Sequence, residues 1–180
     1  MKKLLFLLAM MATVAACQPQ KKGYMLPDPH DVIMYEVNPL VFAQEGAFNV
    51  IASRLDSIRA LRVNVLWLMP TYEQGVLKAK DSPYCIRNYK AVNPKYGTLD
   101  DFKRLVSLCH EKGMSVIMDW VANHTSWDNV WMEEHPDWYT HDEEGNIIWP
   151  ATTNWEDVAD LNFDNPDMRF FSRNIASYLR

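Results

Sequence analysis

Three short apolar runs, at residues 32–37, 63–70 and 114–118, alternate along the chain with two longer amphipathic stretches. The runs are too short for stable helices, and they suit strands of a parallel sheet that is buried on both faces. In the longer stretches, apolar residues recur every three or four positions, as on one face of a helix. These residues are Ile51, Leu55 and Ile58 in the first stretch, and Phe102, Leu105, Val106 and Cys109 in the second. The alternation predicts an α/β protein.

The ends of the predicted helices carry recognisable signals. The first helix is expected from about residue 50 to residue 60. For the second, Thr98 is a favourable N-cap, Asp101 completes a capping box three residues later, and Gly113 suits the C-terminal end. A third helix is expected to begin at Pro166, since proline is favourable in the first turn.

Polar side chains follow the third apolar run at once. Asp119 comes directly after it, and Asn123 and His124 follow within one loop. In parallel α/β proteins, ligand sites lie at the carboxyl ends of the strands. The pattern therefore indicates either a functional site or a buried strand whose end is merely polar.

Two segments are too long to be simple connections. The segment 71–97 has few periodic apolar residues, which predicts either disorder or a functional loop. The segment 126–165 carries five tryptophans, and a unit of this size needs them mainly as a core, although one or two could contact a ligand. His135 and His141 have no partner at metal-site spacing, so we expect both at the surface.

Composition narrows the class of partner. With 48% hydrophobic residues and a formal net charge of −5, the chain has the composition of a globular protein. Its acidity gives no electrostatic reason to expect nucleic acid or an anionic membrane surface as a partner. Beyond the first residues, Cys85 and Cys109 could pair or remain free, buried thiols.

The N-terminus has the features of an export signal. Lys2 and Lys3 precede an apolar stretch that is too short to span a membrane. The residues before Cys17 resemble a bacterial lipobox, so we expect residues 1–16 to be removed and Cys17 to be lipidated. The alternative is an ordinary cleavage site with an incidental cysteine. The polar residues 17–30 would then form a tether.

Several stretches resemble the sequence signatures of the α-amylase family of glycoside hydrolases. The segment 119–124 fits Asp-x-Val-x-Asn-His, and residues 67–70 fit Trp-Leu-x-Pro. Residues 82–89, 94–102 and 158–162 are similar to three further family patterns. The stretches follow the family's order and cover nearly all of the chain after residue 30.

The resemblance implies an α/β fold, the N-terminal portion of a (β/α)8 TIM barrel with about three βα units. It also implies an excursion domain inserted after the third strand. The expected segments are the signal peptide at 1–16, the lipid-anchored tether at 17–30, strands 1–3 with helices 1–2 at 31–125, the excursion at 126–165, and helix 3 at 166–180.

The resemblance also assigns roles to particular residues. Tyr84 falls on the family's tyrosine that stacks on the sugar at the cleavage subsite, and His124 on its sugar-binding imidazole. Asp119 supports the site without doing chemistry. Asn123 and Asp160 fall on positions that contribute oxygen ligands to a structural calcium ion, as hard oxygen donors would.

In the segment 82–89 the chain departs from the family. Cys85 and Asn88 stand where many relatives carry aspartate. The substitutions weaken the expectation of polar contacts to substrate from this loop, but not the expectation of stacking by Tyr84.

The function implied is that of an exported, lipid-anchored glycosidase acting on α-linked glucans with retention. Retaining hydrolysis needs two carboxyl groups ~5–5.5 Å apart. In the family they lie on the fourth and fifth barrel strands, so we expect neither in this chain and expect residues 17–180 alone to be inactive. The alternatives are a non-catalytic carbohydrate-binding or transport-associated relative, and a glucan transferase.

Overall fold

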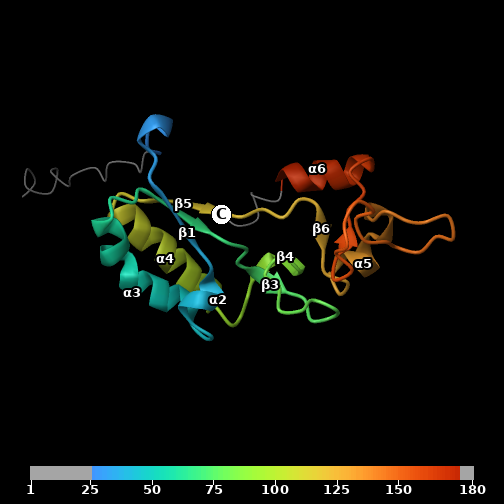
Figure 1. Ribbon diagram of the computed structural model, residues 1–180, viewed down its shortest axis with the longest axis horizontal. Coiled ribbons are helices and arrows are strands. Elements are labelled where there is room, and N and C mark those ends of the chain that lie inside the picture. The colour runs from blue at the N-terminus through green and yellow to red at the C-terminus, as the bar shows by residue number, and fades with distance from the viewer. Residues whose placement is uncertain (1–25, 175–180) are drawn as a thin grey trace, which may run out of the picture.

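The three apolar runs form a parallel sheet, as their length and composition predict. In the computed structural model, which describes residues 26–174, the strands are β1 (Met34–Val37), β2 (Val65–Leu68) and β5 (Ser115–Met118). Their order is β1-β2-β5, with Met34 paired to Val65 and Val65 to Ser115 (Figure 1). Because the strands are parallel, all three carboxyl ends lie at the same edge of the sheet.

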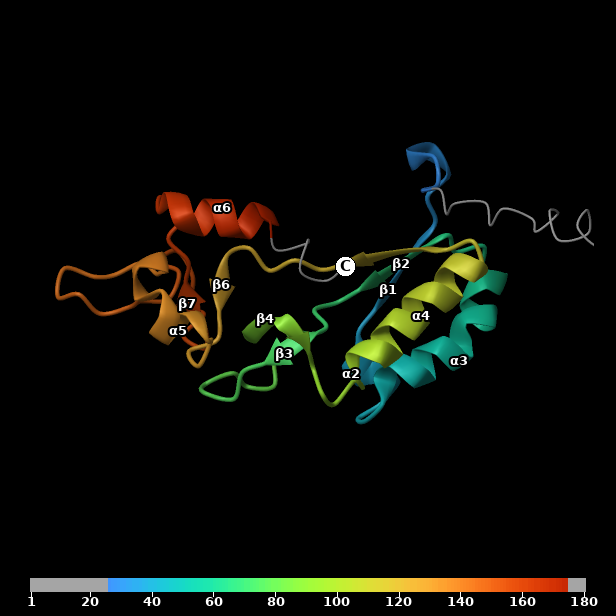
Figure 2. The ribbon, with the colours of Figure 1, turned by 180° about the vertical axis from the view of Figure 1, so that it is seen from behind.

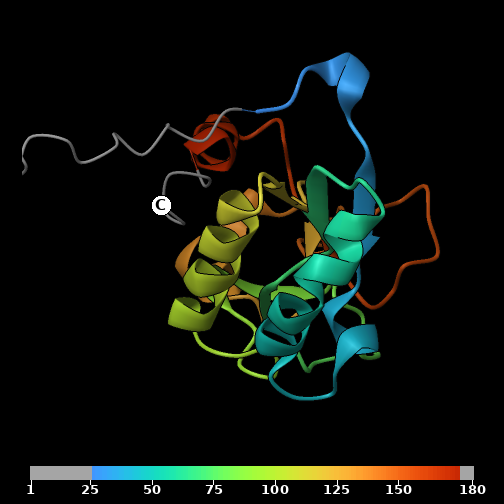
Figure 3. The ribbon, with the colours of Figure 1, turned by 90° about the vertical axis from the view of Figure 1, so that its left-hand side faces the viewer.

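Two amphipathic helices cover one face of this sheet, lying side by side in both further views (Figures 2 and 3). Helix α3 (Ala47–Ala60) begins about three residues earlier than predicted, after Gly46 in the left-handed conformation (φ 66°). Helix α4 (Leu99–Glu111) has the predicted capping box in full. Both helices place their apolar stripes against the strands, in a core that contains Phe48, Leu66 and Leu105.

The opposite face of the sheet corrects the prediction of burial on both sides. Met34 and Ile117, whose side chains point to that face, are 45% and 39% exposed. The helices cover only the other face, so side chains on this one have no partner layer among the described residues. A continuous apolar run did not reveal which of its two faces would be covered, because both are apolar.

The long segment 71–97 is ordered rather than irregular. It contains β3 (Tyr72–Gln74) and β4 (Ile86–Val92), which pair as an antiparallel hairpin with shifts in register. Tyr72, Ile86 and Tyr89 are all buried. These shifts break the alternation of apolar and polar positions, so the hairpin was not visible as a strand pattern.

The excursion lies at the far end of the molecule from α3 and α4 (Figure 1). It follows β6 (His124–Thr125) and comprises α5 (Trp131–Glu134), the 3₁₀ turn η2 (Pro136–Trp138) and β7 (Ala159–Asp160), which pairs antiparallel with β6. Helix α6 (Pro166–Asn174) follows and begins at the predicted proline. Two short elements near the N-terminal end of the described chain complete the fold, η1 (Pro29–Asp31) and α2 (Pro39–Phe42).

The excursion shares one aromatic core with the hairpin. Tyr89 of β4 stacks on Trp131 with ring centroids 4.8 Å apart and planes 6° from parallel. Trp131 and Trp138 are 4% and 5% exposed, whereas Trp149 and Trp155 are 41% and 47% exposed. The expectation that most tryptophans form the core therefore holds only for part of the set.

The histidines and cysteines of the chain differ in their surroundings. His141 is exposed, as predicted, but His135 is half-buried because its ring stacks on Trp138 at 3.9 Å. Cys85 and Cys109 are both buried free thiols, which settles the alternative between pairing and free thiols.

The predicted signal peptide, Cys17 and the first part of the tether lie outside the described residues, as does the last part of the third helix. Within residues 26–174, no helix has the length and apolar character needed to cross a bilayer.

Candidate functional site

The structure joins two of the expected site residues by a direct hydrogen bond. Asp119 follows β5 immediately, and its backbone N–H donates to the Leu68 carbonyl at 2.9 Å, which extends the parallel ladder by one residue. Tyr84 lies on the loop that leads into β4, and its hydroxyl donates to Asp119 Oδ2 at 3.0 Å. A carboxylate at a strand end thus fixes the tilt of an aromatic ring that comes from another segment.

The environment of Tyr84 keeps its hydroxyl protonated. Burial raises the pKa of Tyr84 to about 12, helped by the hydrogen bond to Asp119 and by the negative charges of Asp119 and Glu36. A neutral phenol donates to Asp119 and leaves its lone pairs for a second donor. The ring itself is half-buried, so part of it remains available to a ligand.

His124 begins β6 and is held as a neutral imidazole. Burial lowers the pKa of His124 from 6.5, while the charges of Asp157 and Asp160 and a hydrogen bond with the Tyr84 backbone oppose that shift. The amide Nδ2 of Asn123 lies 3.0 Å from His124 Nδ1. Because an amide nitrogen can only donate, the assigned geometry leaves the ring proton on Nε2.

Tyr84 and His124 line the same cavity, which has a volume of about 320 Å³. The remaining wall residues are Ser82, from the Tyr84 loop, and Trp155, Asp157 and Val158, from the end of the excursion. Trp155 meets the His124 ring nearly at right angles, with centroids 5.6 Å apart. A small cavity with aromatic walls and a few polar groups is typical of a ligand site.

Sequence reasoning missed Asp157, and it named Trp155 only as one of five tryptophans. Their position in the sequence could have identified them, because both lie within the three residues before the stretch 158–162. That stretch pairs with the strand that begins at His124, through His124↔Asp160, and so brings its own N-terminal neighbours to the cavity.

Tyr89 secures the backbone that carries the imidazole. Its hydroxyl lies 2.6 Å from the Val121 carbonyl and 3.1 Å from the His124 carbonyl. Burial raises the pKa of Tyr89 well above 10, so the hydroxyl is a permanent donor. The hairpin therefore supports the site twice, with Tyr84 in the cavity and Tyr89 beneath the loop.

The candidate calcium ligands lie close together along paired strands. Asp160 pairs with His124 across β6 and β7, and the Asn123 carbonyl accepts a hydrogen bond from the Leu161 N–H at 3.1 Å. Asp160 Oδ2 accepts from Thr140 Oγ1 at 2.7 Å, and Asn123 turns its amide nitrogen to His124, which leaves oxygens of both residues for an ion.

The type of these donors fits calcium, which binds hard oxygens. No cluster of three or more histidine, cysteine, aspartate or glutamate side chains that could hold a metal exists within residues 26–174. The rest of a calcium shell would therefore consist of amide or backbone oxygens and water.

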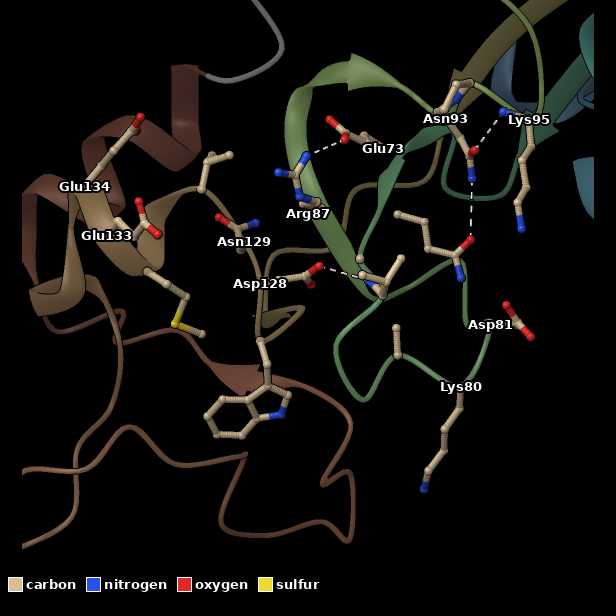
Figure 4. A pocket seen from close by; sticks show the side chains of 18 residues that line it. Glu73, Lys80, Asp81, Arg87, Asn93, Lys95, Asp128, Asn129, Glu133 and Glu134 are labelled. Atoms are coloured by element: carbon tan, nitrogen blue, oxygen red, sulfur yellow. Dashed lines mark hydrogen bonds and ion pairs between the residues drawn. The ribbon is translucent and has the colours of Figure 1, made fainter.

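A larger hollow of about 1140 Å³ lies elsewhere, between the hairpin and α5 (Figure 4). Its wall mixes charges of both signs, and on the hairpin side Arg87 forms an ion pair with Glu73 at 2.5 Å. It includes none of the expected site residues. We therefore assign the site to the smaller cavity, where Tyr84 and His124 meet.

Comparison with known proteins gives the family. The family model described as "Alpha amylase, catalytic domain" matches residues 21–175. A trehalose-6-phosphate hydrolase of Bacillus subtilis is 36% identical over 76% of this chain and 30% of its own length. An amino acid transporter heavy chain of Homo sapiens is 28% identical over 97% of this chain and 30% of its own length.

Solved structures of related proteins contain the same fold. A maltogenic alpha-amylase from Thermotoga neapolitana has a TM-score of 0.78 and 34% identity, over 83% of this chain and 36% of its own. The chain thus spans about a third of the length of the relatives it matches. The sheet and helices correspond to an N-terminal portion of a TIM barrel, as the sequence predicts.

Proposed function

The chain belongs to the alpha-amylase family of glycoside hydrolases, and from that premise we propose that it supplies the sugar-binding side of an active site that cleaves α-linked glucans. The observation that carries this proposal is the convergence of Tyr84 with Asp119 and His124, which lie in a stretch of chain 35 or more residues away. Two of them line a cavity, and the third holds one of those two in place.

We assign each residue a distinct task in that site. Tyr84 offers an aromatic face to the apolar C–H groups of a sugar ring. The hydrogen bond from its hydroxyl to Asp119 fixes the orientation of that face. His124, kept neutral by burial, donates a hydrogen bond to a sugar hydroxyl without adding a charge. Both groups would act mainly by holding the ring as it flattens toward an oxocarbenium-like transition state.

Double displacement with retention is the mechanism we propose for the whole protein. It requires a carboxylate nucleophile and an acid/base carboxyl group ~5–5.5 Å apart. In the family these groups lie on the fourth and fifth barrel strands, and this chain spans about a third of its relatives' length. Residues 17–180 alone are therefore expected not to hydrolyse glucans.

A second candidate is a non-catalytic, transport-associated protein, supported by the similarity over 97% of the chain to the human amino acid transporter heavy chain. The hydrolase is favoured because the cavity keeps both sugar-facing side chains. A glucan transferase would use the same cavity and differ only in the acceptor of the sugar.

A calcium ion held by Asn123 and Asp160 is part of the proposal. It would supply structural cohesion between the two strands that carry those residues, since calcium binds several oxygens at once. Replacing either residue with alanine should lower the melting temperature, and the loss should shrink as calcium is raised from micromolar to millimolar. If calcium changes nothing in the wild type or in either variant, the ion is not bound there.

Export and lipid anchoring through Cys17 complete the proposed function. The support is the sequence around Cys17, with a basic start, an apolar stretch and small residues before the cysteine. The protein would then act on glucans outside the cytoplasm, at a membrane surface.

The test of the function is an assay of the full-length protein with maltotriose and maltoheptaose, followed by proton NMR. Hydrolysis with the α-anomer as first product supports a retaining glycosidase. Longer oligosaccharides would indicate a transferase, and no turnover by full-length protein would favour the transport-associated candidate. Activity of purified residues 17–180 above a denatured control would contradict the placement of the catalytic pair outside this chain.

A further inference from the structure

The wall of the sugar cavity opposite the Tyr84 loop consists of a short segment at the end of the excursion. Trp155, Asp157 and Val158 line it, with the backbone of Glu156 between them. None of these positions has a role in the proposed function above. They face the same cavity as His124 but come from a different element than Tyr84.

Three contacts hold this segment in place before any ligand arrives. The Trp127 indole N–H donates to the Glu156 carbonyl at 2.9 Å. The Cys85 thiol lies 3.7 Å from the carbonyl oxygen and 3.6 Å from the carboxylate of Asp157. Burial raises the pKa of Cys85 to about 12, so the thiol remains a donor. The segment is thus fixed from two sides, which reduces the entropy lost when a ligand binds.

Trp155 is exposed, whereas two other tryptophans of the excursion are buried. It is 47% exposed, whereas Trp131 and Trp138 are 4% and 5% exposed. It therefore contributes little to the aromatic core, and within residues 26–174 the only aromatic ring that its own ring contacts is that of His124. A large aromatic ring held at the mouth of a polar cavity, and left partly open, has the geometry of a platform for an apolar ligand face.

Asp157 supplies the complementary polar group. Its carboxylate is half-buried at the cavity, and among the described residues it accepts one weak hydrogen bond, from the Cys85 thiol. Carboxylate oxygens accept hydrogen bonds from neutral hydroxyl donors strongly. A sugar presents this combination, with apolar C–H faces and hydroxyl groups at the rim.

We propose that Trp155 and Asp157 are substrate-contacting residues that bind the sugar unit next to the one held by Tyr84 and His124, and so set the preference for longer α-glucans. The inference rests on the proposed function, since it names further contacts of the same site. It predicts that affinity rises with chain length through these two side chains.

The test uses the full-length protein and a thio-linked maltotriose that the enzyme cannot cleave, with binding followed by isothermal titration calorimetry. Trp155→Ala and Asp157→Asn should each raise the Kd on the order of 3- to 10-fold, the effect of losing one aromatic contact or one hydrogen bond. Trp155→Phe should fall between wild type and Trp155→Ala, and it keeps the test valid if the alanine variant folds poorly.

Two matched controls come from the same segment of chain. Trp149 is 41% exposed and lines none of the described cavities, and Glu156 is the carboxylate next to Asp157. Trp149→Ala and Glu156→Gln should leave the Kd within about twofold of wild type. If the test variants bind like these controls while the wild type binds sugar, only the inference fails. If the wild type binds no α-glucan, the proposed function fails and the inference with it.

Discussion

At the scale of single residues, His124 combines burial with a polar task. A buried imidazole that stays neutral can donate to a sugar hydroxyl without the cost of desolvating a charge. Its neighbours Asp157 and Asp160 favour the protonated form, but burial outweighs them and lowers the pKa of His124 below 6.5.

This balance predicts a pH dependence of stability. A folded-state pKa below the unfolded value means that the unfolded protein binds more protons as pH falls. The contribution of His124 is therefore fully present above pH 6.5 and is lost as pH falls below that value. We expect the wild type to lose more of its free energy of unfolding than His124→Gln between about pH 7.5 and 5.5, in urea titrations. Equal losses in the two proteins would show that His124 is not desolvated.

The sequence named Tyr84 and His124 as candidate site residues because short motifs carry them, but it did not reveal the contact that holds Tyr84. The hydrogen bond from Tyr84 to Asp119 spans 35 positions, and no local pattern encodes such a distance. Trp155 and Asp157 were harder to identify from the sequence, because they lie in the excursion, where the spacing of apolar residues fits neither a helix nor a strand.

At the scale of elements, the regular barrel units were predictable and the hairpin was not. Helix α4 carries its own N-cap signal and a clear apolar stripe, so its limits follow from local chemistry. The hairpin of β3 and β4 is held by tertiary contacts, including the stacking of Tyr89 on Trp131. Contacts of this kind override local propensity and leave no periodic trace in the sequence.

Replacing Tyr89 tests whether its hydroxyl joins the hairpin to the loop that precedes β6. Tyr89→Phe keeps the ring but removes the hydroxyl that bonds the Val121 carbonyl at 2.6 Å. A buried carbonyl left without its donor should cost about 1–3 kcal/mol in the free energy of unfolding. Chemical denaturation should detect that loss in the full-length protein.

The matched control for this substitution is Tyr35→Phe. Tyr35 lies on β1 and is 36% exposed, and its change should cost less than about 0.5 kcal/mol. Equal effects at the two positions would mean that the Tyr89 hydroxyl does not hold the loop that carries His124.

At the scale of the whole molecule, the parallel sheet and the shared aromatic core bring separate segments to one cavity. The hairpin loop provides Tyr84, which Asp119 at the carboxyl end of β5 holds by a hydrogen bond, and the excursion provides the opposite wall with Trp155. The fold class could be predicted from the alternation of strands and helices. The cavity could not be predicted, because one of its walls forms only when the excursion folds back through the pairing of β6 and β7.

The proposed lipid anchor at Cys17 predicts where the protein is found in the cell. Cys17→Ala should abolish acylation and shift the protein from the membrane fraction to the soluble fraction, since the lipid is the only proposed anchor. Labelling with an alkyne fatty acid, followed by fractionation, measures both effects. If the wild type carries no label, residues 1–16 are an ordinary export signal and Cys17 is incidental.

The central claim is that the cavity of Tyr84 and His124 binds the sugar whose bond is cleaved. The most direct measurement is kcat/KM of the full-length protein on maltotriose for His124→Ala, with His141→Ala as the control at an exposed histidine of the excursion. Loss of a hydrogen bond that strengthens in the transition state should lower kcat/KM by on the order of 10²- to 10³-fold, while the control stays within about twofold. If His124→Ala retains near-normal kcat/KM, the sugar is cleaved elsewhere and the site assigned here is wrong.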